Sequence, residues 1–131
     1  AGRVFVGVEA AIRADGSLDI TDDERDLADV LFVGLHAQLR MSAAKLTARV
    51  VAAITQPGVH VLAVDRVRSP VRLDLDEVFA AAAAHNVAIE IGAADGAAAL
   101  THAQVRRIAE FGATAVVTSG AAAPGARGLK R

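Results

Sequence analysis

The chain has 131 residues, a length that suits one domain with a substantial buried core. Its 14 basic and 15 acidic residues give a net charge of -1, which argues against a surface built for nucleic acid or for anionic membranes. There is no Tyr or Trp, which disfavours base-stacking platforms, and no Cys, which excludes disulfides and thiolate metal sites.

Two further absences concern the location of the protein. No apolar run approaches the ~20 residues of a membrane-spanning helix. The first residues lack the basic and then apolar layout of a signal peptide. We therefore expect a cytoplasmic protein with no membrane partner.

The chain begins with a predicted strand, a short helix and a second strand. Residues 4–12 are rich in Val and alternate as a buried strand does. Thr21 followed by Glu24 forms a capping box, which predicts a short helix over 22–28. The apolar run 30–36 predicts the second strand.

The middle of the chain repeats this order. Ser42 is placed to cap a longer helix, and Pro57 is placed to end it. Residues 60–65 predict a third strand. Asp74 then caps a helix predicted over 75–85, which contains a run of Ala, the best helix former.

The last third completes the pattern. Residues 87–91 predict a fourth strand, and Thr101 with Gln104 forms a second capping box. That box opens a helix predicted over 102–111, and residues 114–118 predict a fifth strand.

Alternating strands and helices predict an α/β fold. The strands are almost continuously apolar, which is typical of parallel strands that are covered on both faces. We expect one domain over residues 1–131, in which residues 120–131 form a loose tail.

A candidate site follows from this fold, because functional residues collect beyond the carboxyl ends of parallel strands. We place Glu9 and His36 at two neighbouring ends. A carboxylate and an imidazole can share a zinc, manganese or iron ion, although zinc usually takes three or four protein ligands. The alternative interpretation is that Glu9 is a buried, paired carboxylate and His36 a hydrogen-bonded core histidine.

Other polar residues suggest weaker roles. Arg40 and Arg68 fall in the loops after the second and third strands, where forked hydrogen bonds could hold a phosphate. The alternative is a solvated loop. His60, His85 and His102 fall at strand and helix ends, and we interpret them as structural or solvated.

Several motifs together resemble a known family. They include the run Glu9 to Asp19, the segment Gly34-Leu35-His36-Ala37, and the strand Val87-Ala88-Ile89-Glu90-Ile91. In this order they resemble the C-terminal half of the PHP (polymerase and histidinol phosphatase) family. The similarity covers nearly all of residues 4–124. It is strongest to the PHP domains of bacterial family X DNA polymerases and their stand-alone relatives.

The resemblance implies a partial, distorted (βα)7 TIM-like barrel. It also implies a metal-dependent phosphoesterase that uses up to three zinc, manganese or iron ions and metal-bound water. Within that resemblance Glu9 matches a metal-bridging glutamate and His36 a metal-ligating histidine. Arg68 matches an arginine that commonly follows the third strand.

Other ligand positions of the family are changed. Val64 replaces a histidine, and Gly120 and Ala122 replace an aspartate and a histidine. The resemblance therefore implies a degenerate PHP-like domain, a pseudoenzyme with a vestigial metal site at Glu9 and His36. We expect no strongly bound cofactor, with zinc or manganese if the family site survives, and a role as scaffold or binding unit.

Two alternatives stay open. The chain could be one part of a metal-dependent phosphoesterase completed by a missing N-terminal segment or a partner, with Arg40 and Arg68 on the substrate phosphate. It could also be an accessory domain associated with a DNA polymerase. We expect an isolated half-barrel either to form a homodimer that completes the sheet or to close as a small α/β sandwich.

Overall fold

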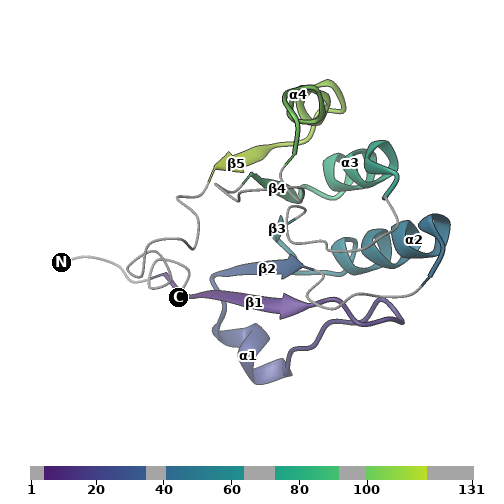
Figure 1. Ribbon diagram of the computed structural model, residues 1–131. Helices are drawn as coiled ribbons and strands as arrows, with labels where there is room; N and C mark the ends of the chain where they lie inside the picture. Colours follow the sequence, from purple (N-terminus) through teal and green to yellow (C-terminus); the bar gives the residue numbers. More distant parts are fainter. Residues whose placement is uncertain (1–4, 35–40, 64–72, 92–99, 118–131) are drawn as a thin grey trace.

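The computed structural model describes residues 5–34, 41–63, 73–91 and 100–117 (Figure 1). Strands and helices alternate along these ranges, as predicted. The strands are β1 (Gly7–Ala11), β2 (Val30–Gly34), β3 (Val61–Leu62), β4 (Ala88–Ile91) and β5 (Ala115–Val117). The helices are α1 (Asp22–Leu27), α2 (Ala43–Ile54), α3 (Leu75–Ala84) and α4 (His102–Glu110). None of these helices is long and apolar enough to cross a bilayer.

The five strands form one parallel sheet in the order β1-β2-β3-β4-β5. The predicted α/β class and the predicted parallel pairing are therefore confirmed. Each strand pairs with its neighbours in sequence, and parallel strands connected in this order usually carry their crossover helices on one face of the sheet. Figure 1 shows α2, α3 and α4 side by side along one side of the sheet.

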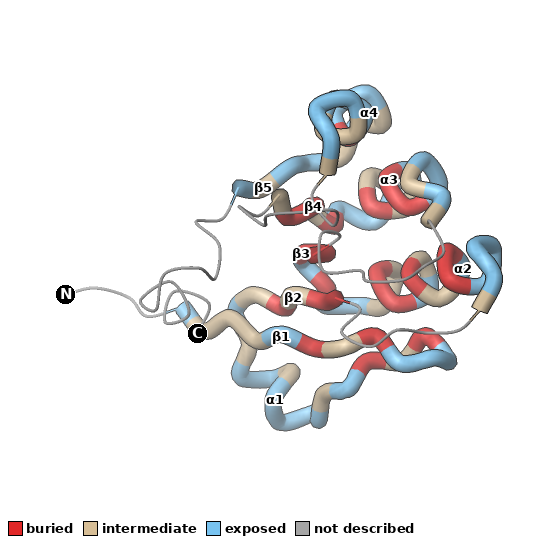
Figure 2. Tube along the Cα trace, viewed as in Figure 1, coloured by how far each residue is buried: buried red, intermediate tan, exposed pale blue. Residues whose placement is uncertain are grey.

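The core lies between the sheet and these three helices. Its largest members include Leu46, Val50 and Ile54 of α2, Phe79 of α3 and Ile108 of α4, which meet Leu31, Val33, Leu62 and Ile89 from the strands. Figure 2 shows the buried positions concentrated along this interface, whereas α1 contributes none. Burial of each large aliphatic or aromatic side chain contributes about 1.5–3 kcal/mol to stability.

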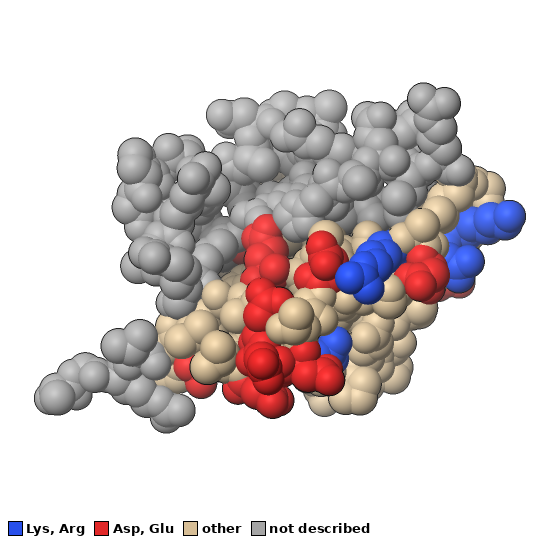
Figure 3. All heavy atoms as spheres, turned by 90° about the horizontal axis from the view of Figure 1, so that it is seen from below, with Lys and Arg blue, Asp and Glu red and all other residues tan. Residues whose placement is uncertain are grey.

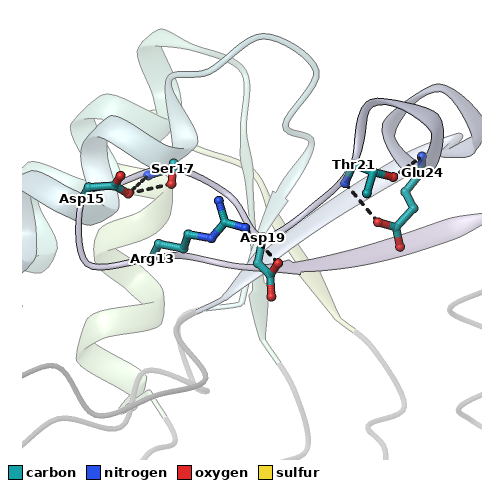
Figure 4. A network of polar contacts seen from close by, with 6 residues as sticks. All are labelled: Arg13, Asp15, Ser17, Asp19, Thr21 and Glu24. Carbon is teal, nitrogen blue, oxygen red and sulfur yellow. Dashed lines mark hydrogen bonds and ion pairs between the residues drawn. The ribbon is translucent and has the colours of Figure 1, made fainter.

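Side-chain contacts at the helix starts confirm the predicted caps. The Thr21 hydroxyl accepts a hydrogen bond from the Glu24 amide at 3.1 Å, and the Thr21 amide donates to the Glu24 carboxylate at 3.0 Å (Figure 4). Thr101 and Gln104 repeat this arrangement at α4. Each contact satisfies an amide that the first helical turn leaves without a partner.

Ser42 and Asp74 cap the other two helices. Each side chain accepts a hydrogen bond from the amide three residues later, at Lys45 and at Glu77. The helix ends also have a local cause. Asn86 and Gly112 take positive φ values of 57° and 78° just beyond α3 and α4, the conformation that stops a helix.

Two predicted strands were drawn too long. Within the described part of the predicted strand 4–12, β1 covers Gly7–Ala11; just before its start, the Val6 amide donates to the Asp29 carboxylate at 2.8 Å instead of to a neighbouring strand. The predicted strand 60–65 contains β3, which pairs with β2 at two positions only. Residues 64 and 65 lie outside the described ranges, as does the predicted tail 120–131.

A tight turn follows β1 and packs against α2. The Asp15 carboxylate accepts hydrogen bonds from the Ser17 amide at 2.9 Å and from its hydroxyl at 2.6 Å (Figure 4). Gly16 has a φ of 87°, and a Cβ placed on it would lie 3.2 Å from the Cβ of Ala52. The Gln56 side chain donates to the Gly16 carbonyl at 2.9 Å. This turn needs glycine both for its backbone angle and for its close approach to the helix.

Candidate carboxylate positions on the sheet

Two glutamates lie on the sheet face opposite the helices. Ala10 of β1 and Ile89 of β4 point into the core, so the adjacent Glu9 and Glu90 point to the other face. Glu9 is exposed, whereas Glu90 is only 1% exposed. Glu90 is the single buried charged residue within the described ranges.

The position of Glu9 corrects two expectations. Glu9 is the middle residue of β1, not its carboxyl end, because Ala10 and Ala11 continue the pairing with β2. The alternative interpretation of Glu9 as a buried carboxylate is also wrong, because its side chain lies on an exposed part of the sheet.

The strand register separates the two glutamates. Glu9 is in register with Phe32, Phe32 with Val61, and Val61 with Ala88, which precedes Glu90 by two residues. Three strand spacings place β1 and β4 about 14 Å apart. The register therefore does not place the two glutamates beside each other, and within the described ranges they are not part of any group of three His, Cys, Asp or Glu that could hold a metal ion.

Glu90 has small neighbours on its own face of the sheet. Leu62 of β3 is in register with Ile89 of β4, so the next residues, Ala63 and Glu90, lie beside each other. Leu62 is also in register with Val33 of β2, so Gly34 lies beside Ala63. Both Gly34 and Ala63 are buried. Their small size leaves room for the carboxylate side chain within the buried part of this face.

The sequence contained a signal for Glu90. A charged residue between Ile89 and Ile91 interrupts an apolar strand, and burial of a carboxylate is costly unless other groups compensate for it. Glu90 is not among the predicted site residues.

Most of the predicted site lies elsewhere in the chain. His36, Arg40 and Arg68 fall outside the described ranges. The pairing of His36 with Glu9 and the binding of a phosphate by the two arginines therefore stay predictions. Across residues 5–34, 41–63, 73–91 and 100–117, no three His, Cys, Asp or Glu side chains are grouped so that they could hold a metal ion. These ranges thus do not supply the three or four ligands of a usual zinc site.

The other three histidines have the structural or solvated positions that we expected. The His60 Nδ1 accepts a hydrogen bond from the Leu31 amide at 2.9 Å, and the His60 amide donates to the Leu31 carbonyl at 3.0 Å. His60 thus joins β2 to the start of β3. His85 is the exposed C-cap of α3, and His102 is the exposed first residue of α4.

A small cavity opens at the amino ends of β4 and β5. Its volume is about 230 Å³, and its lining includes Asn86, Val87, Gly112 and Thr114. None of the described residues that line it is charged. The cavity lies at the opposite end of the strands from the predicted site.

The surface around α1 is strongly acidic. Exposed carboxylates stand at Asp22, Asp23, Glu24, Asp26 and Asp29, and the view from below shows acidic side chains gathered there (Figure 3). The first three favour helix formation, since they lie at the positive end of the α1 dipole. Such a surface repels a phosphate backbone, so it lends no support to the DNA-associated alternative.

Comparison with known proteins adds no assignment: no protein-family profile matches the chain, and no curated protein matches it.

Proposed function

We propose that the chain is a PHP-like domain without phosphoesterase activity that serves as a scaffold or binding unit. The supporting observation is that the elements of the α/β fold are intact while the predicted ligand positions are not. Both capping boxes are formed and the sheet is continuous. In contrast, Val64, Gly120 and Ala122 stand where the resemblance implies metal ligands.

The remaining ligand set is too small for a strong metal site. The resemblance leaves Glu9 and His36 as matched ligands. Glu90 does not lie beside Glu9, because β2 and β3 stand between their strands in the sheet. Two protein ligands fall short of the three that a catalytic zinc ion usually has, so metal-activated water would not form efficiently.

Metal content and hydrolysis can be measured together on the full chain. The protein is incubated with zinc or manganese, freed of unbound metal and analysed by mass spectrometry. Hydrolysis of bis(p-nitrophenyl) phosphate is then followed. Glu9→Gln is the test variant, and Asp23→Asn removes an exposed acid from α1 as a matched control.

We expect metal far below one ion per chain and no hydrolysis above background in all three proteins. Stoichiometric metal together with turnover that Glu9→Gln lowers, and that Asp23→Asn leaves unchanged, would overturn the proposal. If all three proteins retain the same amount of metal and none hydrolyses the substrate, the ion binds at a site without Glu9, and the proposal that the domain is inactive still holds.

A second candidate is one part of a phosphoesterase that a further segment or a second copy completes. The observation that favours it is the solvent exposure of β5. Val117 is 81% exposed, although its register partner Ile91 is partly buried against the core. β5 ends the strand order and carries no charged residue, and an apolar edge without charges can pair with another strand.

The oligomeric state tests the homodimer form of this candidate. Light scattering over a range of concentrations should show a dimer that Val117→Lys dissociates, because a charge on an edge strand opposes pairing. Thr114→Lys adds the same charge just before β5 and controls for net charge. A strictly monomeric chain at every concentration would remove the homodimer form.

A further inference from the structure

We draw no further inference here: the strongest candidate, the uncovered edge of β5 with its exposed Val117, already belongs to the second proposed function, and nothing in the described part of the chain shows what covers it.

Discussion

Arg107 of α4 holds Asp76 of α3 through two parallel hydrogen bonds. The Arg107 Nε donates to one carboxylate oxygen at 2.7 Å, and Nη2 donates to the other at 2.6 Å. The same guanidinium lies 5.5 Å from the centre of the Phe111 ring. The pair lowers the pKa of Asp76 and raises the pKa of Arg107, in both cases chiefly through the side-chain hydrogen bonds.

The lowered pKa of Asp76 predicts a pH dependence of stability. A carboxylate with a lowered pKa in the folded state stabilises the fold above its ordinary pKa of 3.8, and that contribution is lost as the pH falls through the folded value. Asp76→Asn should therefore be less stable than the parent chain at neutral pH, and the difference should shrink below about pH 4. Urea unfolding at neutral and acidic pH measures it. Asp23→Asn serves as the control, and an equal pH dependence for both variants would contradict the prediction.

Replacement of His60 should weaken the junction of β2 and β3. His60→Ala leaves the amide of the buried Leu31 without its acceptor, which typically costs about 1–3 kcal/mol. His85→Ala removes an exposed histidine and should change the free energy of unfolding by less than about 0.5 kcal/mol. Chemical denaturation of both variants gives the comparison. Equal losses would show that the contact with Leu31 does not stabilise the fold.

Alanine substitutions at two glycines with almost the same φ can distinguish the energetic effect of backbone strain from that of steric crowding. Gly16 and Gly58 have φ values of 87° and 85°, so alanine is strained at both positions by about 1–2 kcal/mol. Only at Gly16 does an added Cβ approach another residue, Ala52 at 3.2 Å, and Gly58 has nothing within 4 Å. Gly16→Ala should therefore destabilise more than Gly58→Ala in thermal unfolding. A larger loss of stability for Gly58→Ala would mean that α2 moves away from the added Cβ at position 16 without destabilising the fold.

The core should depend strongly on Phe79. This ring is fully buried between the sheet and its neighbouring helices, and Phe79→Ala should cost about 3–5 kcal/mol because it leaves a cavity. Leu27→Ala truncates a side chain that is 70% exposed on α1 and should have little effect. A denaturant titration of each variant measures its free energy of unfolding. A small loss at Phe79 would indicate that the surrounding Ala and Val side chains collapse into the space.

Local features of the fold could be predicted because their causes lie within a few residues. Thr21 with Glu24, and Thr101 with Gln104, carry the complete information for a helix start. Strand lengths could not be predicted in the same way. β3 is short because of where it pairs with β2, and that pairing depends on residues far apart in the sequence.

The candidate site was less predictable for a related reason. Whether two strand residues come together depends on register and strand order. Glu9 pairs with Phe32, which places it in the middle of β1 instead of at the carboxyl end of that strand. The burial of Glu90 depends equally on which face of β4 is covered, and the alternation of apolar residues gives no information about that.

The sequential strand order also determines how the fold should open. Because every strand pairs only with its neighbours in the chain, the unit formed by α4 and β5 can detach without breaking any other strand pair. Within it, α4 places only Ile108 in the buried core, and β5 has no buried residue. Amide hydrogens of this unit should therefore exchange through local fraying at a lower free energy than those of β2 and α2. Within the described sheet, opening would then begin at α4 and β5 before it reaches β2 and α2.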